Sequence, residues 1–184
     1  MNIIQSLDAN MLFWIQNNIH NIFLDKLMSF VTTLGDIGAI WILISIALLF
    51  SRKYRTIGIL TLSVLLLNTI LGEGILKNLI HRPRPFNTLE GLDIIVKKPS
   101  SYSFPSGHTS SAIAAALMLG HYFKKYRWYI YIFAGLIAFS RIYLLVHYPS
   151  DVLGGIVLGA ISYIIVKFIY EQYINKKKNN IFAK

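Results

Sequence analysis

The sequence contains no cysteine and few charged residues. Without cysteine, the chain can form neither a disulfide framework nor a metal site with thiolate ligands. Charged residues make up 14% of the 184 residues, whereas soluble domains usually carry about 25%. Hydrophobic residues make up 55%, and they occur in long blocks rather than at scattered positions. This distribution predicts a chain embedded in a membrane.

The N-terminus also lacks the pattern of a secretory signal peptide. It has no basic start, and polar residues such as Asp8, Asn10 and Gln16 interrupt its apolar stretch. Acidic residues are scarce, and the formal net charge is +10. Nucleic-acid binding could explain this excess, but the basic residues fall between apolar blocks, as in loops that flank membrane helices. We therefore expect the lipid bilayer, and no nucleic acid, as a partner.

Six apolar segments are predicted to cross the bilayer, whose core requires about 20 apolar residues per helix. Residues 7–19, which precede them, are typical of an amphipathic helix that lies at the interface. The predicted fold is an all-α integral membrane bundle of six transmembrane helices with this interfacial helix, in one domain over residues 1–184. Glycines 154, 155 and 159 favour close helix packing over a specific dimer motif. The predicted spans are residues 22–34, 37–50, 56–76, 107–123, 128–145 and 152–170.

The basic residues predict how the helices are oriented. Clusters follow the second, fourth and sixth predicted spans, so all three lie on one side, which the positive-inside rule makes cytoplasmic. The connections 78–102 and 141–150 then face the outside of the plasma membrane. Residues 174–184 are expected to form a basic, disordered cytoplasmic tail beside anionic lipid. The clusters are Arg52, Lys53 and Arg55; Lys124, Lys125 and Arg127; and Lys176, Lys177, Lys178 and Lys184.

Ionisable residues are costly at membrane depth, so a group of them there indicates function. In this chain they concentrate at the predicted outward ends of the spans. Arginine binds phosphate oxygens through paired N–H groups and lysine acts as a point charge, so the group is typical of a phosphate site. The scarcity of carboxylates argues against a divalent metal site. The candidates are Lys77, His81, Arg82, Arg84, Ser106, Gly107, His108, Ser140, Arg141, His147 and Asp151.

The segment 105–108, Pro-Ser-Gly-His, stands where the fourth span begins. Ser106 is a natural N-cap, and Gly107 would let backbone N–H groups approach an anion closely. The positive end of the helix dipole would add to the attraction.

His147 and Asp151 stand four residues apart, with Pro149 between them. Proline suits the first turn of a helix, so Asp151 should lie about one turn into the last span. A carboxylate bonded to one ring nitrogen fixes the tautomer and leaves the other nitrogen free to attack. His108, which comes from another helix, could protonate the leaving oxygen as a general acid.

These residues resemble three motifs of the type 2 phosphatidic acid phosphatase and vanadium haloperoxidase superfamily. Its pattern is a lysine, six residues and Arg-Pro; then Pro-Ser-Gly-His; then Ser-Arg, five residues, histidine, three residues and aspartate. Residues 77–85, 105–108 and 140–151 match every spacing. The order of the spans also resembles bacterial membrane members, so the resemblance covers nearly the whole chain.

The resemblance implies a phosphoric ester or diphosphate hydrolase that acts on a lipid phosphate. It implies that His147 forms a phosphohistidine intermediate, with Asp151 in support. It further implies that His108 protonates the leaving group and then activates water. No metal and no cofactor are implied. The residues implied to hold the phosphate are Lys77, Arg84, Ser106, Gly107 and Arg141.

The residues leave several substrates and two other functions open. Undecaprenyl diphosphate, phosphatidylglycerol phosphate and phosphatidate are all candidates, and an outward-facing site favours undecaprenyl diphosphate because it suits recycling of a lipid carrier. A vanadate-dependent haloperoxidase would use the same residues, but such relatives are expected to be soluble. A lipid-phosphate binding or transport protein would not need the complete set of nucleophile, acid and orienting carboxylate.

Three residues beside the motifs have two interpretations each. Glu73, four residues before Lys77, could form an ion pair that positions this lysine, or could simply face the bundle interior. Arg82 could contact the substrate head group or belong to the loop. His81 could be a loop residue alone, or a loop residue that lies near the substrate.

Overall fold

The computed structural model describes the backbone of residues 3–182 and the side chains of residues 3–176. Within these residues all regular structure is helical, which confirms the predicted all-α class. Short helices η1 (Asp36–Gly38), η2 (Ile70–Leu76, a π-helix) and η3 (Pro85–Asn87) connect or extend the main ones. The main helices are α1 (Ile3–Asn18), α2 (Ile22–Leu34), α3 (Ala39–Leu49), α4 (Arg55–Thr69), α5 (Lys77–Ile80), α6 (Gly107–Tyr122), α7 (Arg127–Tyr143) and α8 (Pro149–Phe182).

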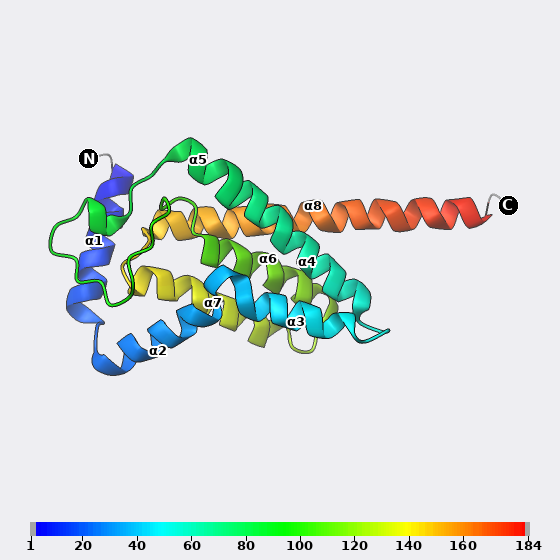
Figure 1. Ribbon diagram of the computed structural model, residues 1–184, viewed down its shortest axis with the longest axis horizontal. Coiled ribbons are helices and arrows are strands. Elements are labelled where there is room, and N and C mark those ends of the chain that lie inside the picture. The colour runs from blue at the N-terminus through cyan, green and yellow to red at the C-terminus, as the bar shows by residue number, and fades with distance from the viewer. Residues whose placement is uncertain (1–2, 183–184) are drawn as a thin grey trace.

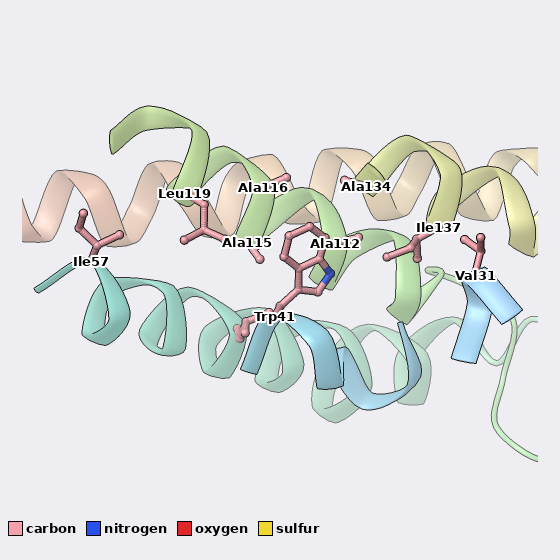
Figure 2. Packing of buried hydrophobic residues seen from close by; sticks show 10 residues of the cluster. Val31, Trp41, Ile57, Ala112, Ala115, Ala116, Leu119, Ala134 and Ile137 are labelled. Carbon is pink, nitrogen blue, oxygen red and sulfur yellow. The ribbon is translucent and has the colours of Figure 1, made fainter. Parts of the chain in front are cut away.

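The Ala-rich helix α6 lies at the centre of the bundle, where it packs against α4, α7 and α8. Its small side chains let the neighbouring helices approach closely. On α8, a Cβ atom added to Gly159 would lie 2.6 Å from the Ser110 carbonyl oxygen, so the predicted close packing of this glycine is confirmed. On another side of α6, the ring of Trp41, a residue of α3, fills the space between α3 and α6 (Figure 2).

The structure does not confirm the predicted first and second spans as two separate antiparallel crossings. Helices α2 and α3 are bent by only 43° at their junction, and α3 continues in the general direction of α2 (Figure 1). The junction contains Ile37 and Gly38, both with positive φ (55° and 73°), which turn the chain without reversing it. By length and composition the pair passes the test for one span only when its two helices are taken together.

The two ends of the bundle differ in character. Helix α1 lies across one end, together with the loops that follow α5 and α7 (Figure 1). The turns that join α3 to α4 and α6 to α7 lie at the other end, where Lys53, Lys124 and Lys125 line one small pocket. Two of the predicted basic clusters therefore share one end, opposite to α1.

Length and composition support membrane insertion for part of the bundle. The helical stretches Arg55–Asn87 and Pro149–Lys176 are long and apolar enough to cross a bilayer, and the bent pair Ile22–Leu34 and Asp36–Leu49 would add a third. Helices α6 and α7, with 16 and 17 residues, are shorter. Large apolar side chains are nevertheless exposed along α7, among them Trp128, Ile132 and Leu136.

Helix α8 extends well beyond the bundle at the basic end (Figure 1). Its backbone stays helical to Phe182, so the tail predicted to be disordered continues the helix. Once a helix is nucleated, each added residue gains one backbone hydrogen bond, which favours this extension. The side chains of Lys177 and Lys178 in the predicted basic cluster, and all of Lys184, lie outside the described residues.

Candidate active site

A cavity of about 750 Å³ opens at the end of the bundle that carries α1. Segments far apart in the sequence contribute to its wall, among them residues 29–38 around the junction of α2 and α3 and the loop residues 96–101. Six of the eight residues predicted for the site line this cavity: Lys77, Arg84, Gly107, His108, Arg141 and His147. The other two, Ser106 and Asp151, are fully buried behind the wall. The structure thus brings the three motifs together around one space.

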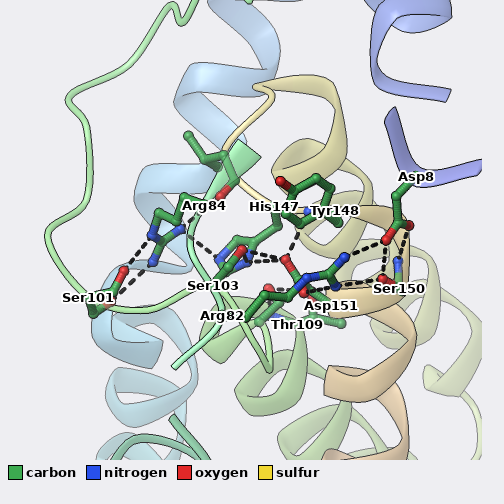
Figure 3. A network of polar contacts seen from close by, with 12 residues as sticks. Asp8, Arg82, Arg84, Ser101, Ser103, Thr109, His147, Tyr148, Ser150 and Asp151 are labelled. Atoms are coloured by element: carbon green, nitrogen blue, oxygen red, sulfur yellow. Dashed lines mark hydrogen bonds and ion pairs between the residues drawn. The ribbon is translucent and has the colours of Figure 1, made fainter. Parts of the chain in front are cut away.

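His147 and Asp151 form the pair predicted from their spacing. The ring Nδ1 of His147 lies 3.4 Å from the Asp151 carboxylate, and neither side chain is exposed to solvent beyond 2%. Pro149 starts α8, which places Asp151 in the first turn as expected. The same carboxylate accepts hydrogen bonds from the Ser103 hydroxyl (2.5 Å) and the Tyr148 backbone N–H (2.9 Å) (Figure 3). These contacts hold Asp151 against the ring of His147.

The other ring nitrogen of His147 faces a cation. Nε2 lies 3.1 Å from a guanidinium nitrogen of Arg84, which can donate only to an unprotonated nitrogen. The pKa of His147 is lowered to about 3, mainly because burial penalises the charged ring. Both features agree with a neutral ring that donates from Nδ1 to Asp151 and keeps a lone pair on Nε2. That lone pair is what a nucleophile requires.

Three cations, Lys77, Arg84 and Arg141, line the cavity together with His147, and each is at least 95% buried. Arg84 donates to the Ser101 carbonyl (2.7 Å) and the Val146 carbonyl (2.8 Å), which fixes its fork. Arg141 donates to the Thr32 hydroxyl, and its Nε has no hydrogen-bond partner among the described residues. A buried charged donor without a partner is costly, so Arg141 is suited to an anion in the cavity.

Lys77, the third cation, pairs with Glu73 at 2.7 Å, which confirms the ion-pair interpretation of Glu73. Lys77 also donates to the Ser101 hydroxyl at 3.2 Å. Glu73 lies in the π-helix η2, a form of helix that is frequent at functional sites. The wider turn of this π-helix affects the direction in which the Lys77 side chain points, and Lys77 lines the cavity together with Arg84 and Arg141.

Helix α6 begins at the cavity, as predicted. Ser106 is its N-cap, and the Ser106 hydroxyl accepts a hydrogen bond from the Thr109 hydroxyl at 2.9 Å. Because Ser106 does not line the cavity, its predicted contact with phosphate stays a prediction. At Gly107, an added Cβ would lie 2.6 Å from a Glu73 carboxylate oxygen, so a larger residue would crowd the lysine's partner.

Several residues at the site were missed from the sequence. Asp36, between α2 and α3, lies 2.8 Å from Nε2 of His108. A charged residue between two apolar blocks was a signal that could have identified it. Ser101 and Ser103 bind the motif residues from an irregular loop, and Thr32 binds Arg141 from within an apolar helix. Their positions follow no periodic pattern, so sequence reasoning had no signal for them.

Arg82 does not line the cavity, and it binds protein groups instead of facing a ligand site. Its guanidinium pairs with Asp151 (2.6 Å) and with Asp8 of α1 (2.7 Å) (Figure 3). The head-group interpretation of Arg82 therefore has no support. His81 ends α5 in a left-handed conformation and contacts the Tyr102 ring edge-on, in agreement with a loop residue.

Among the described residues, no group of three or more His, Asp or Glu side chains is arranged to hold a metal ion. Metal independence stays a prediction. The cavity wall offers mainly cationic and neutral donors, which suit an anionic ligand.

Comparison with known proteins identifies the class to which this fold and site belong. The PAP2 superfamily matches residues 56–175, and the chain therefore belongs to this family. It is 34% identical over 146 residues to an undecaprenyl-diphosphatase of Sulfolobus acidocaldarius, a match that covers 78% of this chain and 70% of the relative. It is 31% identical over 176 residues to undecaprenyl-diphosphatase BcrC of Bacillus subtilis, covering 85% and 88%.

A solved structure agrees with this assignment. A transmembrane PAP2-type phosphatidylglycerolphosphate phosphatase from Bacillus subtilis superposes with a TM-score of 0.75 at 31% identity, covering 94% of this chain and 88% of that one. The family and the class of enzyme predicted from the sequence, a phosphatase, are confirmed.

Proposed function

We propose that this chain is an integral membrane phosphatase that hydrolyses a lipid diphosphate or phosphomonoester, with undecaprenyl diphosphate as the preferred substrate. The reaction proceeds through a phosphohistidine at His147 and uses no metal. One observation carries the proposal: the buried side chains Lys77, Arg84 and Arg141 converge with His147 and His108 on a single cavity.

In the first step, Nε2 of His147 attacks the terminal phosphorus while the bond from phosphorus to the leaving oxygen breaks. His108 donates its proton to that oxygen, so the leaving group departs as a neutral alcohol or a lipid monophosphate. Lys77, Arg84 and Arg141 neutralise the charge on the other phosphate oxygens, which is where preorganised donors lower the barrier most. Asp151 accepts the Nδ1–H of His147 and stabilises the ring as it becomes positively charged.

In the second step, His108 takes a proton from water, and the water oxygen attacks phosphorus. The bond between phosphorus and Nε2 breaks, and its electron pair returns to His147. Inorganic phosphate leaves, and both histidines regain their starting protonation. The cavity contains both histidines in its wall, so one phosphate group can meet both in turn.

We infer five membrane crossings in a single domain: the α2–α3 pair, α4 with η2, α6, α7 and α8. Helix α1 lies at the interface, with Ile3, Leu7 and Trp14 exposed toward lipid. The basic turns at the opposite end favour a cytoplasmic location for that end, so the site faces the extracytoplasmic side of the plasma membrane and α8 ends in the cytoplasm. Cationic side chains therefore occur at both ends of the bundle for different reasons: those in the site bind phosphate, and those in the turns at the opposite end orient the helices.

Two observations support a diphosphate as substrate. Lys97 and Lys98, from the loop that precedes α6, line the same cavity as the three buried cations. Five cations around one space suit two phosphate groups better than one. Two relatives of this chain are named undecaprenyl-diphosphatases.

The test is a phosphate-release assay with the purified full chain in detergent and a chelator. Undecaprenyl diphosphate, phosphatidylglycerol phosphate and phosphatidate are compared at equal concentration. We expect release in the presence of chelator, inhibition by vanadate, and the highest kcat/KM for the diphosphate. His147→Ala should abolish release, whereas His121→Ala, at the opposite end of the bundle, should not. Activity that requires added magnesium and survives His147→Ala would overturn the mechanism.

A further inference from the structure

A chain of alternating charges extends from the active site to the N-terminal helix. His147 contacts Asp151, Asp151 pairs with Arg82 at 2.6 Å, and Arg82 pairs with Asp8 at 2.7 Å. Figure 3 shows the Arg82 guanidinium between the two carboxylates. The centre of the Tyr148 ring lies 4.0 Å from the guanidinium carbon of Arg82, so the ring covers one face of the guanidinium group. Arg82 is therefore held on two edges and one face.

Asp8 is the outer member of this chain, and its environment is unusual for a carboxylate. It lies on α1, a helix with large exposed apolar side chains, yet Asp8 itself is only 3% exposed. Besides Arg82, it accepts hydrogen bonds from the Ser150 backbone N–H (3.0 Å) and the Ser150 hydroxyl. Ser150 lies in the first turn of α8, where free N–H groups and the helix dipole favour a negative charge.

We propose that Asp8 is a positioning residue for the reaction and acts on the His147–Asp151 pair through Arg82. Helix α1 thereby belongs to the active site and is more than a membrane anchor. This inference rests on the proposed function, since it assumes that His147 is the nucleophile. Asp8 precedes the residues 56–175 that match the family, so the family pattern does not include it.

The hydrogen bonds of Arg82 explain why the His147–Asp151 pair is held better when Arg82 has two carboxylate partners than when it has one. Arg82 gives one N–H group to Asp151 and another to Asp8, so its fork is divided between them. An arginine that faced Asp151 alone would favour the bidentate arrangement typical of arginine and carboxylate. That arrangement would draw the carboxylate toward Arg82 and away from the ring of His147. Asp8 prevents this by holding the second N–H group, and it also fixes the start of α8, which carries Asp151.

The first experiment replaces the Asp8 carboxylate without changing its size. Asp8→Asn should lower kcat for phosphate release about tenfold, the lower end of the range seen when an outer hydrogen-bond partner of a metal-bound histidine is removed. KM and the affinity for vanadate should change less than twofold, because Lys77, Arg84 and Arg141 still bind the anion. The matched control is Asp25→Asn, which removes another carboxylate near α1, one that accepts from the Tyr143 hydroxyl at 2.6 Å. The control should keep the wild-type kcat.

A double-mutant cycle separates positioning from a general structural effect. If Asp8 acts through Asp151, then Asp8→Asn should cost tenfold in the wild type and less than twofold when added to Asp151→Asn. An equal loss in both backgrounds would show that Asp8 only supports the fold, and the proposal would be wrong. A kcat for Asp8→Asn within twofold of the wild type would also overturn it.

A second variant covers the case in which Asp8→Asn does not fold, because Arg82 then loses the carboxylate that binds one of its two N–H edges. The combination Asp8→Asn with Arg82→Gln removes both charges and also the hydrogen bond from Arg82 that holds Asp151, so it should again lower kcat about tenfold. A wild-type kcat in this variant would refute the role of the pair.

The proposed function fails in a different way from this inference. If His147→Ala retains activity, the nucleophile is wrong whatever Asp8 does. If His147→Ala is inactive and Asp8→Asn is not impaired, only the role of Asp8 is wrong.

Discussion

The Asp36 carboxylate lies 2.8 Å from Nε2 of His108, so each of the two histidines at the cavity has its own carboxylate. Asp151 holds His147 from α8, and Asp36 holds His108 from the junction of α2 and α3. A carboxylate in this position orients the ring and stabilises the positive charge that a proton donor carries. The junction of α2 and α3 therefore contributes Asp36 to the cavity wall.

Asp36→Asn should lower kcat on lipid phosphates about tenfold and have a smaller effect on an aryl phosphate. The aryl oxygen is a good leaving group and needs little protonation, so loss of an efficient acid matters less. The measurement is kcat for both substrates with the purified variant, compared with Asp93→Asn, which removes an exposed carboxylate from the loop between α5 and α6. An equal loss on both substrates would assign Asp36 to binding or folding instead of proton transfer.

Arg141→Lys keeps a positive charge at the cavity but removes the guanidinium fork. Lysine can replace neither the bond to Thr32 nor the free Nε donor in the same geometry, so we expect kcat/KM to fall about 100-fold, as when one preorganised donor is lost. Vanadate should bind more weakly, in a titration that follows inhibition. The matched control is Arg127→Lys, at the opposite end of the same helix, which should behave as the wild type.

The helices and the meeting of the three motifs could be predicted from the sequence because both follow from local pattern. Long apolar blocks specify the helices, and Ser106 and Pro149 mark two helix starts through chemistry that acts within one turn. The spacing from Lys77 to Arg84 and from His147 to Asp151 then places the functional groups at neighbouring helix ends.

The direction of α3 could not be predicted, because an apolar block shows that a helix can enter a bilayer and not whether the next one reverses. The answer depends on the backbone at Ile37 and Gly38, which bends the chain by only 43°. The pairing of Asp8 with Arg82 had no local signal either, since 74 residues separate them. Contacts of this kind arise only when distant helices pack.

The free energy of unfolding should depend on pH because His147 is buried. Its pKa is lowered to about 3, chiefly by burial, from an ordinary value of 6.5. Between these values the unfolded chain binds a proton that the folded chain does not, so this contribution is complete above pH 6.5 and is lost as the pH falls toward 3. Thermal unfolding followed by tryptophan fluorescence should show a melting temperature that declines below pH 6.5.

His147→Gln should make that decline less steep, because the variant lacks the group whose protonation differs between the two states. His20→Gln is the control, a histidine at the same end of the bundle whose ring contacts the Tyr143 carbonyl at 2.8 Å. An unchanged acid dependence in His147→Gln would mean that His147 is already protonated in the folded protein, which would also weaken its assignment as nucleophile.

Gly159→Ala should destabilise the protein where α8 crosses α6. The added Cβ would lie 2.6 Å from the Ser110 carbonyl oxygen and 3.0 Å from the Ala114 nitrogen, and these backbone atoms cannot move unless α6 moves. Overpacking of this kind costs about 1–3 kcal/mol. Gly135→Ala on α7 is the control, since its Cβ would meet no described atom within 4 Å, and its melting temperature should be unchanged or higher. Because α6 carries His108 and α8 carries Asp151, Gly159→Ala should lower kcat as well. A wild-type melting temperature and kcat in Gly159→Ala would show that these helices have room to separate, contrary to the packing described.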